Sequence, residues 1–210
     1  VGLSVANGTT DLGSVENVTI SGAGAVDLGT IANTSLNDLD SFDASGNTGG
    51  VTAEVSTDDN GVDIEEFVFS QGDDVVTLES GTTVFNVDID GNGGTNRFVA
   101  DGNDLKTNEA AIAAGLSNFQ VLEIGDNSDD DVDVGELGFD DVITNQTGNM
   151  LTLSDMADGG SVTLQGDNAG GGVVVDVANA GDQGEDDNVL NAEVTTATTD
   201  LDAGTLTADD

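Results

Sequence analysis

The chain has 210 residues, of which 42 are Asp or Glu and only 2 are Lys or Arg, and it contains no His, Cys, Pro, Trp or Tyr. A formal net charge of −40 excludes nucleic-acid binding, because phosphate recognition needs clustered Lys and Arg. No run of about 18 apolar residues is present, so no segment is expected to insert into a membrane. Without His or Cys for acid–base or nucleophilic chemistry, we do not expect an enzyme.

Short alternating apolar runs, each bounded by Gly, Asn, Asp or Ser, predict a protein of many short strands. In chain order the predicted strands cover 15–20, 26–28, 50–55, 65–70, 75–78, 83–89, 121–124, 150–153, 161–164 and 173–177. One helix is predicted over 108–116, with Asn108 as its N-cap and Gly115 near its end. The seven Phe residues and the many Val, Leu, Ala and Ile residues supply the expected core.

Strands that alternate with acidic glycine turns, with almost no helix between them, are typical of a parallel β-solenoid with steps of about 20 residues. An all-β parallel solenoid is therefore the predicted fold, and antiparallel β-sandwich domains are the alternative. The stretch "VTISGAGAVDLGTI" (18–31) is similar to "LEIGDNSDDDVDVGELG" (122–138), which predicts two divergent repeat units, 1–105 and 106–210. The opening "VGLSVANGTT" suggests a piece of a longer chain.

The acidic residues create a problem for folding, because Arg97 and Lys106 cannot neutralise them and self-repulsion opposes a compact state unless cations intervene. A disordered chain is one alternative, above all without metal. Halophilic adaptation is another, in which acids hold water and monovalent ions, and it predicts acids scattered over strand faces. Many acids here cluster instead in glycine turns, which favours specific cation sites.

These turns offer the oxygen ligands that calcium prefers, namely carboxylates, Asn side chains and backbone carbonyls that glycine can turn inward. The stretch "GDDVV" (72–76) is followed at "GTNRF" (94–98) by a weaker copy with Asn96 in the Asp place, and "DIDGNG" (88–93) sets oxygens at alternate positions. Solvated acidic loops, or Asp and Gly serving turn geometry, are the alternative for each turn. The candidate calcium ligands are Asp73, Asp74, Asp88, Asp90, Asn92, Asp104, Asp129, Asp131, Asp133, Asp186 and Asp187.

The successive stretches "VENVTISGAGAVDLGTI" (15–31), "GDDVVTLESGTT" (72–83) and "GNMLTLSDMADGGSVTLQGD" (148–167) resemble the calcium-binding surface-layer and RTX-type proteins that bacteria export by type I secretion. The resemblance implies a calcium-stabilised parallel β-solenoid within a larger secreted protein. It also implies that Asp74 is a ligand of the repeat and that Asn188 occupies a comparable place.

We therefore expect a structural, extracellular protein of the cell surface that calcium stabilises and that assembles with copies of itself into a layer or filament. Cell-surface polysaccharide is a further candidate partner. The alternative is a calcium-rigidified stalk or adhesion module of a large secreted protein. A halophilic surface protein is a third reading, for which "NGT" (7), "NVT" (17), "NTS" (33) and "NQT" (145) are candidate N-glycosylation patterns.

Overall fold

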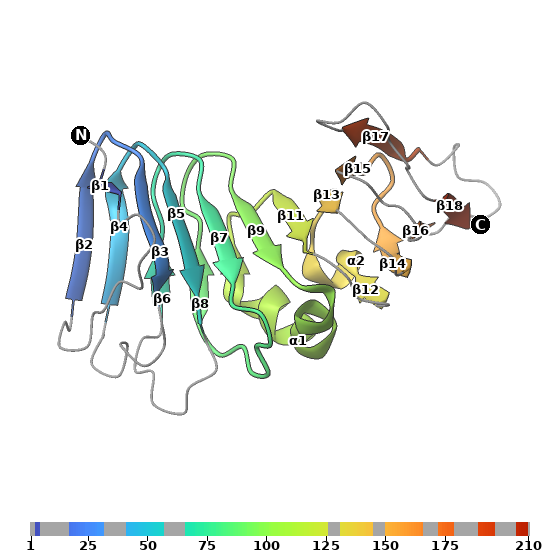
Figure 1. Cartoon of the computed structure of the whole chain (residues 1–210), viewed down its shortest axis with the longest axis horizontal. Coiled ribbons are helices and arrows are strands. Elements are labelled where there is room, and N and C mark those ends of the chain that lie inside the picture. The colour runs from blue at the N-terminus through green and yellow to red at the C-terminus, as the bar shows by residue number, and fades with distance from the viewer. Residues whose placement is uncertain are drawn as a thin grey trace. The chain divides into compact units, whose positions relative to one another are not determined.

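The computed structural model describes residues 3–4, 17–31, 41–56, 66–125, 131–144, 150–165, 172–178, 189–195 and 205–209. The fold is mostly β, and the chain forms two compact units (Figure 1). The first unit is Val1–Val99 with Ala114–Gln120, and the second is Ala100–Ala113 with Val121–Asp210. The division into repeat copies 1–105 and 106–210 stays a prediction, because compactness does not test sequence repetition.

The first unit consists of two parallel sheets between which the chain alternates. The odd-numbered strands β1 (Leu3–Ser4), β3 (Val26–Ile31), β5 (Val51–Val55), β7 (Val75–Leu78) and β9 (Arg97–Ala100) follow one another in one sheet. The even-numbered strands β2 (Asn17–Gly22), β4 (Ser41–Asn47), β6 (Glu66–Val68), β8 (Asp88–Asp90) and β10 (Leu116–Ser117) form the other. We call an even-numbered strand, the turn after it and the next odd-numbered strand a step.

The second unit follows the same rule. Its odd-numbered strands are β11 (Val121–Ile124), β13 (Asp141–Thr144), β15 (Ser161–Gln165) and β17 (Asn191–Thr195). Its even-numbered strands are β12 (Asp131–Asp133), β14 (Met150–Met156), β16 (Gly172–Val177) and β18 (Thr205–Asp209). The described residues also include the helices α1 (Gly102–Gly115) and α2 (Val134–Leu137), and no helix in this part of the chain is long and apolar enough to cross a membrane.

Apolar side chains lie in register from step to step and form the core. Phe42 pairs with Phe67, and Phe67 with Ile89, and all three are buried. The rings of Phe42 and Phe67 lie 5.7 Å apart between centroids, a separation at which aromatic pairs attract. In the second unit Leu122, Val142 and Val162 form a corresponding buried column. Because each core position repeats on the next strand, thin layers of Val, Leu and Phe are enough to form a continuous core.

The mostly β class and the parallel pairing agree with the sequence prediction, and the antiparallel alternative is wrong for the described strands. The predicted helix exists but begins at Gly102, six residues before the predicted start at 108. Asn108 is therefore not its N-cap. It is buried inside the helix, where its Nδ2 donates to the carbonyl of Asp104 at 3.1 Å.

Candidate functional site

Polar side chains in the turns of the first unit form a ladder that connects neighbouring steps. Asp74 Oδ1 accepts a hydrogen bond from the Val51 backbone N–H at 2.6 Å. Asn96 Oδ1 accepts from the Asp74 N–H at 2.9 Å, and Gln120 Oε1 accepts from the Asn96 N–H at 2.7 Å. Donor and acceptor are separated by 23, 22 and 24 residues in sequence. Each side chain thus holds the backbone of the step before it, and we name this set the turn ladder.

Asp74 is the charged member of the turn ladder and is almost completely buried. Besides Val51, its carboxylate accepts from the Ser70 backbone N–H at 3.0 Å and from the Ser70 hydroxyl at 2.6 Å. Burial raises the pKa of Asp74, while these hydrogen bonds from Ser70 and Val51 act in the opposite direction. The carboxylate therefore accepts from protein donors, which gives it a structural role in holding this turn to the step before it.

Asn96 occupies the next position of the turn ladder and is fully buried, with an exposed fraction of 0%. Its Nδ2 donates to the carbonyls of Gly91, Gly93 and Asn118 at 2.9, 2.9 and 2.8 Å. The amide nitrogen thus lies among three backbone carbonyl oxygens, which are the kind of ligand that cations such as calcium also bind. Sequence analysis identified Asn96 as a variant of Asp74, and the structure places both on the same ladder.

The glycines of these turns are required by the stacking of turn on turn. Gly94 has a φ of +82°, which favours glycine, and a Cβ there would clash with the Gly72 carbonyl. A Cβ on Gly72 would in turn clash with the Gly50 backbone nitrogen. Acids adjoin tight glycine turns here because the turn must be small for its neighbour to stack and must supply an acceptor for the neighbour's N–H.

The other predicted ligands of the first unit lie in or near the same turns, where Asp73 and Asp88 are exposed and Asp90 and Asn92 are half-buried. Asp73 is exposed, and its Oδ1 accepts from the Thr95 N–H at 2.8 Å. Asp90 Oδ1 accepts from the Asn92 N–H and from Asn118 Nδ2, both at 2.7 Å, so Asp90 and Asn92 are brought together in one turn. Asp88 is exposed and lies in register with Glu66.

In the second unit Asp131 and Asp133 lie near two glutamates that sequence reasoning missed. Glu109 Oε1 accepts from the Asp133 N–H at 2.7 Å, and Asp133 Oδ1 caps α2 by accepting from the Glu136 N–H at 2.8 Å. Burial raises the pKa of Glu109, and the charges of Asp133, Glu136 and Asp131 raise it further. We call Glu109, Asp131, Asp133 and Glu136 the acidic cluster.

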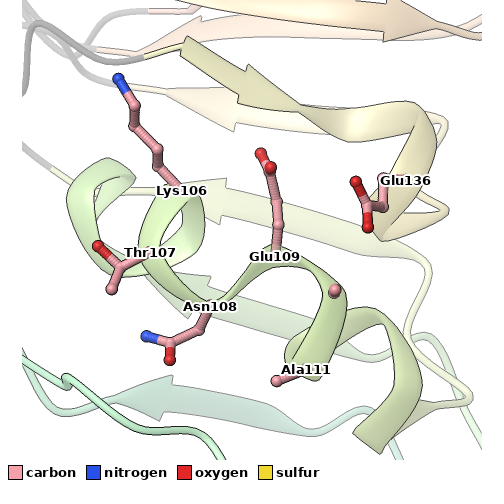
Figure 2. Close-up of a pocket in the computed structure, with 7 residues that line it drawn as sticks. Lys106, Thr107, Asn108, Glu109, Ala111 and Glu136 are labelled. Atoms are coloured by element: carbon pink, nitrogen blue, oxygen red, sulfur yellow. The ribbon is translucent and has the colours of Figure 1, made fainter.

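A shallow groove of about 410 Å³ lies beside the acidic cluster. It is lined by Lys106, Thr107, Asn108, Glu109, Ala110, Ala111 and Glu136. In the view of Figure 2 the Glu109 side chain extends from α1 between Lys106 and Glu136. Glu109 and Glu136 are far apart in sequence, so no local motif identifies this arrangement.

The remaining predicted ligands are not brought into a common site. Asp104 is buried in the first turn of α1, where its N–H donates to the Asp101 carbonyl. Asp129, Asp186, Asp187 and Asn188 lie outside the described residues. Within the described ranges no group of three or more Asp, Glu, His or Cys side chains is arranged to hold a metal ion. Calcium binding by the eleven candidate ligands stays a prediction.

Acids are also common on strand faces, where most have a hydroxyl as their in-register neighbour. Thr30 Oγ1 donates to Glu54 Oε2 at 2.6 Å, and the Ser161 hydroxyl donates to Asp141. Acid–hydroxyl register pairs also join Asp27 to Thr52, Asp43 to Thr19, Asp131 to Thr152, and Glu193 to Thr163. Acid lies beside acid in the pairs Glu66 with Asp88 and Asp176 with Asp209. This distribution over strand faces is the one that the halophilic alternative predicts.

Comparison with protein-family models, with curated proteins and with solved structures found no match. The resemblance to surface-layer and RTX-type proteins therefore remains a prediction from sequence.

Proposed function

We propose that this chain is a structural, extracellular protein of the cell surface, a parallel β-solenoid that cations stabilise and that assembles with copies of itself. The observation that carries the proposal is the turn ladder. Asp74, Asn96 and Gln120 all bind the backbone of the preceding step, and two of them, Asp74 and Asn96, are buried. Buried polar groups that are fully hydrogen-bonded make a fold rigid, which supports a structural role.

The charge of the chain supports a role for cations, with calcium as the proposed cofactor. A net charge of −40 on 210 residues opposes the compact state, and binding of counter-ions to the folded form stabilises it by mass action. The charges of Asp133, Glu136 and Asp131 raise the pKa of Glu109, and Glu66 lies in register with Asp88, so a cation near these carboxylates would relieve their repulsion. In low calcium the same repulsion keeps the chain unfolded, which suits export before folding.

A second candidate is a halophilic surface protein that monovalent salt alone stabilises, and the acids on strand faces favour it. In this case the carboxylates hold water and sodium ions without a defined geometry. The two candidates share the fold and the structural role, and they differ in which cation the folded state requires.

Calcium and sodium titrations distinguish the two candidates. The chain is first treated with a chelator and then titrated with calcium chloride or, in parallel, with sodium chloride at matched ionic strength, while circular dichroism and particle size are followed. Under the calcium proposal, only calcium converts a disordered spectrum into β-structure and produces large particles. An equal response to sodium chloride supports the halophilic candidate. A β-spectrum that is unchanged by either salt contradicts both.

A further inference from the structure

The turn between β8 and β9 contains an Asn–Gly pair, Asn92–Gly93. A Gly after Asn favours deamidation, because Gly has no side chain to hinder attack of its backbone nitrogen on the Asn side-chain carbonyl. In this reaction the Gly93 nitrogen bonds to Asn92 Cγ and the Cγ–Nδ2 bond breaks. The Nδ2 group leaves as ammonia with the proton that the Gly93 nitrogen gives up, and a five-membered succinimide ring remains.

Hydrolysis of the ring gives two products that differ in the length of the main chain. Water that breaks the new bond to Cγ leaves Asp at position 92. Water that breaks the original peptide bond leaves isoaspartate, in which the main chain runs through the side-chain carbons and is one carbon atom longer. The consequence for folding therefore depends on whether the turn can accept a longer main chain.

The folded turn holds the reacting nitrogen in place. The Gly93 N–H donates to the Ser70 carbonyl of the step before it at 3.1 Å, and the Gly93 carbonyl accepts from Asn96 Nδ2 at 2.9 Å. Asn92 has a φ of +57°, and its own N–H donates to Asp90 Oδ1 at 2.7 Å. Hydrogen bonds thus fix the peptide groups on both sides of Gly93, so its nitrogen reaches Asn92 Cγ only when the turn opens locally.

The stacked turns leave no room for a longer main chain. A Cβ on Gly91 would lie 2.6 Å from the carbonyl oxygen of Asn118 in the following turn. A Cβ on Gly94 would clash with the Gly72 carbonyl in the preceding turn. Even one added carbon on either side of position 92 thus collides with a neighbouring step. Asp at position 92 adds no main-chain atom and replaces a half-buried side chain, so the turn accepts it.

We propose that Asn92–Gly93 is a modification site controlled by folding. In the unfolded chain Asn92 deamidates, in the folded chain the hydrogen bonds of the turn protect it, and the isoaspartate product prevents the turn from stacking. The pair thus limits the time for which the chain can stay unfolded and still fold. This inference goes beyond the proposed function and is the same whichever cation supports the fold.

The rate of deamidation tests the protection. The full chain is incubated under whichever salt gives the β-spectrum and, in parallel, in urea, each time beside a peptide of residues 88–96 in the same solution. Mass spectrometry of the digested chain measures the exchange of amide for acid at position 92. We expect the chain in urea to react at the rate of the peptide and the folded chain to react at least about tenfold more slowly, because opening of the turn must come first.

Asn92→Gln is the matched control. It keeps an amide side chain, but attack by the next nitrogen must close a six-membered ring, so reaction at this position should nearly stop. Isoaspartate that still forms in this variant comes from other positions, such as Asp90–Gly91, which reacts through the same kind of ring without a change in mass. Equal rates for the full chain and the peptide in every salt overturn the inference.

Refolding of chain that has been aged in urea tests the consequence for folding. The aged chain is transferred to the salt that gives the β-spectrum, and size-exclusion chromatography separates folded from unfolded material. Chains with Asp at position 92 should appear in the folded fraction, and chains with isoaspartate there should be depleted from it. Isoaspartate at position 92 in equal proportion in both fractions overturns the inference, and this result does not depend on whether calcium or sodium supports the fold.

Discussion

The substitution Asn96→Asp exchanges one amide nitrogen for oxygen and tests the turn ladder. Asn96 Oδ1 accepts from the Asp74 N–H, and an Asp oxygen can do the same. The other oxygen of Asp would face the carbonyls of Gly91, Gly93 and Asn118, which now accept from Nδ2 at 2.8 to 2.9 Å. Three attractive contacts become three repulsive ones at a site with no solvent exposure.

The expected cost follows from these contacts. Loss of a hydrogen bond costs about 1 kcal/mol, so three carbonyls account for about 3 kcal/mol. Burial of an unpaired carboxyl adds to this, limited by its uptake of a proton, and we expect a loss of at least about 4 kcal/mol in the free energy of unfolding. Such a loss is a large fraction of the roughly 5 to 15 kcal/mol that stabilises a typical domain. The deficit should shrink as the pH is lowered, because the new carboxyl then becomes neutral.

Urea unfolding followed by circular dichroism measures this free energy. Asn92→Asp is the matched control, since Asn92 is half-buried and its Nδ2 makes one long contact, 3.4 Å to the Phe69 carbonyl. We expect the control to remain within about 1 kcal/mol of wild type. If Asn96→Asp is as stable as the control, the amide is not a structural link and the reasoning about the turn ladder is wrong.

Three further substitutions test the turn ladder, the acidic cluster and the core. Asp74→Ala leaves three buried donors without an acceptor and should cost about 3 kcal/mol, whereas exposed Asp73→Ala should cost less than about 1 kcal/mol in the same urea assay. Burial raises the pKa of Glu109 in the folded state, so its contribution favours folding below its ordinary pKa of 4.5 and is lost as the pH rises through the folded pKa. Glu109→Gln should therefore flatten the fall in stability between pH 4.5 and neutrality, and an unchanged pH profile contradicts this. Phe67→Ala should cost about 3 to 5 kcal/mol and lower the thermal midpoint, and a smaller loss would mean that the Phe columns are not the core.

Alternation of apolar residues predicted strand positions well where the strand is rich in Val, Ile and Leu. The strands 75–78 and 121–124 match β7 and β11 in full. The strand β4 ("SFDASGN") was missed, because Gly, Asn and Asp conceal its alternation and the pairing with β2 and β6 keeps it extended. In the predicted strand 83–89 only its end forms β8, since the preceding segment follows a turn at Ser80 and Gly81.

The functional residues were harder to predict, because an Asp in a glycine turn can either accept a backbone N–H or bind a cation. Asp74 was predicted to bind calcium, and an Asp that accepts a neighbour's N–H occupies the same kind of glycine turn as an Asp that binds calcium. The partner of Asp74 is Val51, which is 23 residues away in sequence. Only the strand register brings the Val51 backbone nitrogen to 2.6 Å from Asp74 Oδ1, so the sequence around Asp74 does not show this contact. Glu109 carried no local signal at all, since the fold brings it to Asp133 from a different element.

The composition of the turn ladder shows how a chain this acidic can stack its turns. Two carboxylates about 4.8 Å apart repel by about 3 kcal/mol even at an effective dielectric constant of about 20, so a ladder of acids would lose more than its hydrogen bonds supply. Asn96 and Gln120 offer the same acceptor oxygen as Asp74 without the charge. On the strands, hydroxyls of Thr and Ser separate most acids in the same way. Most acids on the strands thus lie beside a neutral side chain of the neighbouring step. Where acids do adjoin, as Glu66 and Asp88 do, both side chains are exposed, so dissolved cations can screen their repulsion.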